Sequence, residues 1–186
     1  MKLGPDLFVV IDGFDAANPP APFVRRTLEQ NPDARYVVLL SHLPLLPASP
    51  KFPTPPGSTE ILALLANRPA LILAAHTHRS SLGVRTTKQG ETPQLVVSSM
   101  GSAWQPELLK PGRVGSYAAL SKSPAPELVH KFREFDAGGQ YRFRQLFDNS
   151  GFVILELSER GVDASYYTNN VAKPSAKIRL IAAPRP

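Results

Sequence analysis

The chain has 186 residues, enough for one ordinary domain, and its composition (42% hydrophobic, 19% charged) is that of a globular rather than a disordered protein. The absence of cysteine excludes disulfides, thiolate catalysis and Cys-ligated metals, so any metal must be held by His, Asp, Glu, Asn or water. The net charge of +6 favours anionic partners such as phosphate esters, but the basic residues are scattered and give no evidence for nucleic acid.

The first part of the chain alternates short apolar runs with amphipathic segments. Buried strands are predicted at 7–11, 36–40 and 71–75, and helices at 22–30 and 57–67, the second with Ser58 as its N-cap. The loop at 44–56 is rich in proline, which leaves no room for a regular element. Strands that alternate with helices in this way predict an α/β layered fold.

The second part of the chain has the pattern of antiparallel strands. Strands are predicted at 82–87, 94–98, 141–147, 152–157 and 162–167, with a hairpin turn at 158–161. The stretch 105–140 is poorly patterned. We expect residues 1–170 to form a single domain and residues 171–186 to be a basic, proline-containing tail that frays.

Three of the four histidines come directly after apolar strands. His42 follows the second predicted strand, and His76 and His78 follow the third. Because ligands bind at the carboxyl ends of strands in open α/β sheets, we expect His42 and His76 at the same rim. His76 and His78 are separated by one residue and can reach two metals or chelate one, although such a pair alone also fits hydrogen bonding to loop backbone. His130 lies in an irregular stretch and is expected to be a surface residue.

Two motifs make this region similar to a known family. Ser41-His42-Leu43-Pro44 and Ala75-His76-Thr77-His78-Arg79 follow predicted strands, with one helix and one strand between them. They resemble the lone-histidine motif and the Gly-His-x-His motif of the calcineurin-like metallophosphoesterase family. Residues 97–102 resemble the strand and Gly-Ser turn that follow, and residues 152–167 resemble the closing hairpin. The resemblance covers residues 6–104 well and the remainder loosely.

The resemblance implies a fold, a cofactor and a site. The fold would be part of a layered α-β-β-α sandwich of mixed sheets, with the N-terminal half missing. The complete domain would hold two divalent transition metals. Ligands of the His and oxygen type are compatible with Mn, Fe, Zn, Co or Ni, so the identity of the metals stays open. His42 and His76 would bind the second metal and His78 the first. Arg79 would bind a phosphate oxygen of the substrate or remain solvated.

The chain departs from the family pattern in two ways. Ala75 stands where the family usually has Gly, and the N-terminal Asp-x-His, Gly-Asp and Gly-Asn-His-Asp/Glu motifs are absent. The dipeptide Asp12-Gly13 has the reverse order of the family's Gly-Asp motif, and Asp12 is predicted to be a turn residue rather than a ligand. Three neutral histidines supply no negative charge, and a carboxylate is needed to hold two divalent cations close together. We therefore expect that the chain alone does not build the dinuclear centre.

Three functional hypotheses follow. The first is a truncated metal-dependent hydrolase of phosphate esters, inactive alone, whose partners are its substrate and the missing N-terminal half. The second is a degenerate, non-catalytic binding or scaffold domain, and the third a metal- or anion-binding module unrelated to the family. The first is favoured because residues 1–5 lead directly into a strand from the middle of the family fold. Strands 9–11 or 37–40 should then present an unpaired edge or apolar face.

The sequence leaves the compartment and the substrate open. No apolar run approaches the ~18 residues needed to cross a bilayer. Residues 1–8 lack the basic and apolar regions of a signal peptide, so nothing in this chain points to a membrane. Phosphate monoester, diester, nucleotide and pyrophosphate all remain candidate substrates.

Overall fold

The structure, a computed structural model, describes residues 1–15, 17–48, 53–77, 80–97, 140–147, 151–167 and 172–182. In chain order the elements are β1 (Lys2–Leu3), β2 (Asp6–Ile11), α1 (Ala21–Glu29), β3 (Val37–Ser41), α2 (Ser58–Leu65), β4 (Ala70–Ala74), β5 (Ser80–Thr87), β6 (Gly90–Val96), β7 (Gln140–Phe147), β8 (Phe152–Ser158), β9 (Gly161–Tyr167) and β10 (Ala176–Ala182). The strands and helices predicted for the first part of the chain are thus confirmed, with boundaries shifted by one or two residues.

The strands form two sheets. Seven of them make a mixed sheet in the order β1-β2-β3-β4-β6-β5-β7, and β10-β9-β8 make a second, antiparallel sheet. Strands β2, β3, β4 and β6 run parallel to one another, and β2, β3 and β4 end in register, with Ile11 beside Ser41 and Ser41 beside Ala74. The segments that follow these three strands therefore leave the sheet at one rim.

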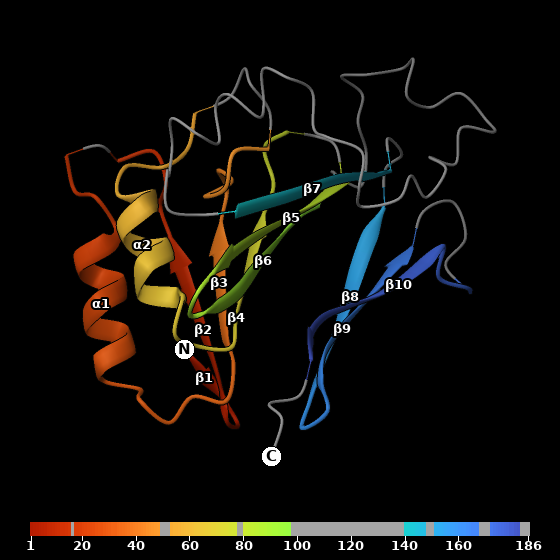
Figure 1. The fold of residues 1–186 in the computed structure, drawn as a ribbon, viewed down its shortest axis with the longest axis horizontal. Helices are drawn as coiled ribbons and strands as arrows, with labels where there is room; N and C mark the ends of the chain where they lie inside the picture. Colours follow the sequence, from red (N-terminus) through yellow and green to blue (C-terminus); the bar gives the residue numbers. More distant parts are fainter. Residues whose placement is uncertain are drawn as a thin grey trace.

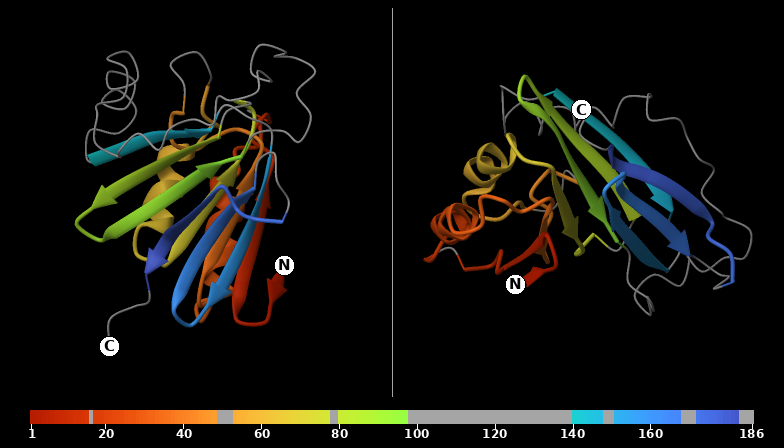
Figure 2. Two further views of the ribbon diagram at one scale, coloured as in Figure 1. Left: turned by 90° about the vertical axis from the view of Figure 1, so that its right-hand side faces the viewer. Right: turned by 90° about the horizontal axis from the view of Figure 1, so that it is seen from below.

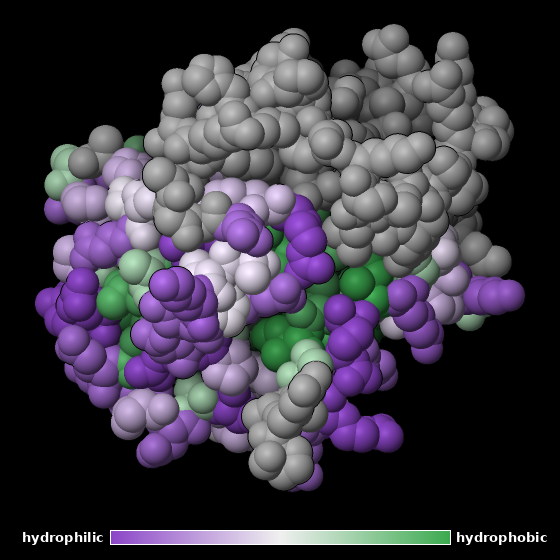
Figure 3. Space-filling view, viewed as in Figure 1, coloured by the Kyte–Doolittle hydropathy of each residue, from purple (hydrophilic) through white to green (hydrophobic). Residues whose placement is uncertain are grey.

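The elements stack in three layers, helices, large sheet and small sheet (Figures 1 and 2). Side chains such as Leu39 and Ile72 face α1 and α2 in one core, whereas Tyr36 and Leu71 belong to a second core shared with β9 and β10. Strands β3 and β4 are covered on both faces, which is why they are continuous apolar runs in the sequence. Figure 3 shows an apolar area at the surface between the two sheets, so the second core is only partly covered there.

The coarse prediction of an α/β fold is confirmed, while the four-layer sandwich stays a prediction. In the parts of the chain that the structure describes, helices lie on one side of the large sheet. None of the helices in these parts has the length and the hydropathy of a membrane-spanning segment.

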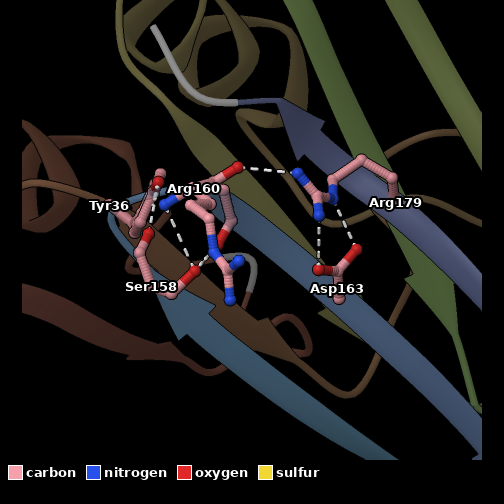
Figure 4. A network of polar contacts seen from close by, with 6 residues as sticks. Tyr36, Ser158, Arg160, Asp163 and Arg179 are labelled. Atoms are coloured by element: carbon pink, nitrogen blue, oxygen red, sulfur yellow. Dashed lines mark hydrogen bonds and ion pairs between the residues drawn. The ribbon is translucent and has the colours of Figure 1, made fainter.

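The expectation of a fraying tail after Val171 is wrong for residues 176–182. They form β10, which pairs with β9 along most of its length. Ala176 and Ile178 face the core between the sheets, and the Arg179 guanidinium donates hydrogen bonds to both carboxylate oxygens of Asp163, at 2.5 and 2.7 Å (Figure 4). The alternation of apolar and basic residues, interpreted as a basic tail, is instead that of a half-exposed strand.

The start of α2 also differs from the prediction. Gly57 is the N-cap, with a φ of 74°, and the buried Ser58 is the first helical residue. The Ser58 hydroxyl donates a hydrogen bond of 2.6 Å to the carbonyl of Pro55 and does not cap the helix. Gly57 was a stronger indication of the N-cap than Ser58, because the N-cap has a left-handed backbone conformation that residues other than glycine rarely adopt.

Strand β2 presents the exposed edge that the sequence predicts, and β3 does not. The outer neighbour of β2 is the two-residue β1, which pairs with its first two residues, whereas β3 is paired on both sides. Val10 is 70% exposed between the buried Val9 and Ile11. Other large hydrophobic side chains exposed in this part of the chain are Met1, Leu3, Phe14 and Phe23.

Candidate metal centre

The common rim of β2, β3 and β4 brings His42 and His76 together. His42 is the first residue after β3, and His76 is the second residue after β4. The Nε2 atom of His42 lies 3.1 Å from the Nδ1 atom of His76, and the ring centroids are 5.1 Å apart at an interplanar angle of 73°. The predicted proximity of these two histidines is confirmed.

A tight turn with a rare backbone conformation holds His76. The Thr77 N–H donates a hydrogen bond of 2.8 Å to the Ala75 carbonyl, so that His76 is the central residue of a γ-turn, and its φ is 65°. The Ala75 N–H in turn donates to the His42 carbonyl at 3.2 Å, which connects the two loops. A γ-turn with positive φ is rare for a residue other than glycine, and such strain is concentrated at functional sites.

The loop after His42 is anchored to the sheet through Gln94. Leu45 and Leu46 belong to the helix-side core, and the Gln94 side chain accepts a hydrogen bond from the Leu46 N–H at 2.7 Å and donates one to the Leu46 carbonyl at 2.9 Å. Gln94 is 1% exposed. The proline-rich segment, uninterpreted in the sequence, therefore holds His42 from its C-terminal side. The sequence feature that could have indicated this anchor is Gln94 itself, a polar residue next to the apolar residues of its strand.

Phe14 forms one wall of the site. Its ring centroid lies 5.4 Å from that of His42 and 6.2 Å from that of His76. The Phe14 N–H donates a hydrogen bond of 2.9 Å to the Asp12 carboxylate, which confirms Asp12 as a turn residue. Nothing in the sequence distinguished Phe14, because its role depends on β2 ending beside β3.

The two imidazoles fit the coordination of one cation. First-row metals bind imidazole nitrogen at about 2.0–2.1 Å, so two ligands at angles between octahedral and tetrahedral have nitrogens about 2.8–3.4 Å apart. The separation of 3.1 Å between His42 Nε2 and His76 Nδ1 lies inside this interval. It also fits a hydrogen bond between two neutral imidazoles, one donating and one accepting.

The other predicted site residues, His78 and Arg79, lie outside the described residues, and so does His130, which was predicted to be a surface residue. Within the described ranges, no group of three or more His, Asp or Glu side chains is arranged to hold a metal ion. The sequence prediction is thus met for the proximity of one histidine pair, and the ligand roles stay predictions.

Comparison with known proteins gives weak structural likenesses, two of which are described here. No protein-family model and no curated protein matches the chain. The chain is similar to GAP50, the anchor in the inner membrane complex of Plasmodium, at 12% identity and a TM-score of 0.48 over 96% of this chain and 50% of that one. It is also similar to PhoD, at 14% identity and a TM-score of 0.44 over 86% of this chain and 31% of that one. The chain therefore spans half of these structures or less.

Proposed function

We propose that the chain is part of a metal-dependent hydrolase of phosphate esters, of the calcineurin-like metallophosphoesterase type. His42 and His76 would hold one divalent transition metal, and His78 would help to hold a second. The observation that carries the proposal is the 3.1 Å approach of the two ring nitrogens at the carboxyl ends of neighbouring parallel strands. The motif resemblance assigns these same two histidines to one metal.

The residues of the site would divide the work as follows. His42 and His76 would coordinate as neutral imidazoles, each with its other ring nitrogen fixed by a hydrogen-bond acceptor. Arg79, next to the histidine motif in sequence, would bind a phosphoryl oxygen. When bound, the metals would supply Lewis-acid chemistry, lowering the pKa of a water and neutralising charge on the phosphoryl group.

The proposal also requires carboxylates, which would come from a segment other than those that form the described site. Asp12, the acidic residue nearest in sequence to the rim of β2, uses one carboxylate oxygen to close its own turn. Two adjacent divalent cations need negative charge between them, because their repulsion is otherwise prohibitive. We infer that a further segment, corresponding to the family's N-terminal half, supplies it and that the 186-residue chain alone binds one cation without turnover.

The second candidate function is a non-catalytic binding or scaffold domain with the same fold. It is favoured by one observation, the 3.1 Å contact between His42 Nε2 and His76 Nδ1, which is also the length of an ordinary hydrogen bond between two neutral imidazoles. Under this alternative, the His42–His76 contact is a hydrogen bond that fixes the two loops, and no metal is needed.

Hydrolysis of aryl phosphate mono- and diesters in the presence of Mn²⁺ or another transition metal separates the two functions. The chain alone should be inactive, and the chain joined to the segment that supplies the carboxylates should hydrolyse at least one ester. In that complete protein, His76→Ala or His78→Ala should abolish most of the rate, because a lost ligand changes both the metal position and the pKa of the water. His130→Ala, at a histidine without an assigned role, is the matched control.

The outcomes discriminate between the alternatives. A complete protein that is inactive with every metal tried contradicts the catalytic proposal, and so do alanine variants that keep full activity. Either result favours the non-catalytic domain.

A further inference from the structure

We propose that Phe14 selects the substrate: it is the surface against which a planar, aromatic group of the phosphate ester stacks. The inference rests on the proposed function and deepens it, because it names the class of ester that the site prefers. It predicts that aryl or nucleoside esters bind better than alkyl esters of the same charge.

The first observation is the exposure of Phe14 beside two polar rings. Phe14 is 61% exposed, although its ring contacts both His42 and His76. Phe14 thus keeps most of its surface accessible while its ring centroid lies 5.4 and 6.2 Å from those of the two imidazoles, so a ligand held by both histidines lies close to the ring.

The second observation is that the turn carrying Phe14 is held in place. The Asp12 carboxylate accepts the Phe14 N–H at 2.9 Å. Gly13 lies against the loop after β3, where an added Cβ would be 3.0 Å from Cγ of Pro55 and 3.4 Å from Cβ of Leu43. A rigid turn gives an exposed ring a fixed position, which lowers the entropy lost when a ligand stacks on it.

The third observation is the chemistry of the surroundings. Aromatic rings favour other rings at centroid separations of about 4.5–7 Å, in offset or edge-to-face arrangements. The two imidazoles already lie at such separations from Phe14, at 5.4 and 6.2 Å. The exposed remainder of the ring offers the same interaction to a phenyl group or a nucleobase, and offers little to a methyl group.

The test compares two probes that differ only in the ester group, phenyl phosphate and methyl phosphate. Their dissociation constants are measured by NMR titration of the 186-residue chain, with and without Zn²⁺. The wild-type chain should bind phenyl phosphate about 3- to 10-fold more tightly than methyl phosphate, as expected for one aromatic pair.

Variants of Phe14 isolate the contribution of its ring. Phe14→Ala should reduce the phenyl-to-methyl ratio of affinities to about one. Phe14→Leu should also reduce this ratio, because leucine has no ring, and Phe14→Trp should keep it at the wild-type value. Phe23→Ala removes another exposed phenylalanine, on α1, and should leave the ratio unchanged. The Leu and Trp variants keep the test valid if Phe14→Ala fails to fold.

The result that overturns the inference is a ratio near one in the wild-type chain, a ratio unaffected by Phe14→Ala, or no detectable binding of phenyl phosphate. Failure of the proposed function gives a different result. A chain that binds no Zn²⁺ contradicts the metal site, while the ratio measured without Zn²⁺ still tests Phe14. Phe14→Ala should leave the Zn²⁺ affinity of the chain within about two-fold, because the ring supplies no ligand atom.

Discussion

At the scale of single residues, the position of His76 could be predicted and its conformation could not. The apolar runs before His42 and His76 place both residues at strand ends, and strand ends of parallel neighbours meet. The φ of 65° at His76 has no signal in the sequence, because it follows from the hydrogen bond between Thr77 and Ala75. Phe14 and Gln94 were missed for a similar reason, since their roles come from contacts between segments distant in the chain.

The strain at His76 makes a prediction about stability. Glycine adopts a positive φ readily and alanine does not, so His76→Gly should be more stable than His76→Ala by about 1 kcal/mol. Both variants lack the imidazole, so their difference in the free energy of unfolding, measured with urea, reports the backbone alone. At His42, which is not among the residues with positive φ, alanine should be the more stable replacement. An alanine variant at 76 that is as stable as the glycine variant would show that the turn is unstrained.

At the scale of elements, the sequence predicts where strands begin and end better than it predicts which strands pair. Continuous apolar runs identify β3 and β4, and the turn at 158–161 identifies the β8–β9 hairpin. The placement of β6 between β4 and β5 depends on long-range pairing, which no local pattern records. Strand β10 was missed because prolines and basic residues flank a short alternation that becomes regular only against β9.

The packing of β10 against the β8–β9 turn predicts the effect of a glycine substitution. Gly161 has a φ of 125°, and an added Cβ would lie 2.2 Å from the carbonyl oxygen of Ile181 on β10. Gly161→Ala should therefore destabilise the protein by about 3 kcal/mol or more, combining backbone strain with overpacking. Gly4→Ala is the control, because Gly4 also has a positive φ but has nothing within 4 Å of an added Cβ. If the two variants lose the same free energy of unfolding in urea, β10 can move away from the added Cβ without destabilising the protein, which would contradict the prediction.

At the scale of the whole molecule, the apolar surface is unevenly distributed. Five of the large hydrophobic side chains described as exposed lie between residues 1 and 23, three of them on or next to the short β1 and on β2, one in the turn after β2 and one on α1. An edge with exposed apolar side chains is a site for association. This surface, together with the missing carboxylates, is the physical basis for proposing that a further segment completes the domain.

We therefore predict that the isolated chain associates through the edge of β2. Sedimentation velocity should show species larger than a monomer as the concentration rises, and Val10→Lys should shift the distribution toward monomer, because a lysine on an edge strand opposes pairing. Ile154→Lys, at another exposed apolar position on β8, should have a smaller effect. A wild-type chain that is monomeric and highly soluble at all concentrations contradicts the prediction.

The central claim is that His42 and His76 are ligands of one divalent metal, and calorimetric titration of the 186-residue chain with Zn²⁺ tests it most directly. The account predicts one Zn²⁺ per chain, with His42→Ala and His76→Ala each weakening the affinity at least about 10-fold and His130→Ala leaving it unchanged. The spacing of 3.1 Å between the two ring nitrogens is the reason to expect that both variants lose the same ion. A wild-type chain that binds no Zn²⁺, or alanine variants at 42 and 76 that bind it as tightly as the wild type, would contradict the account.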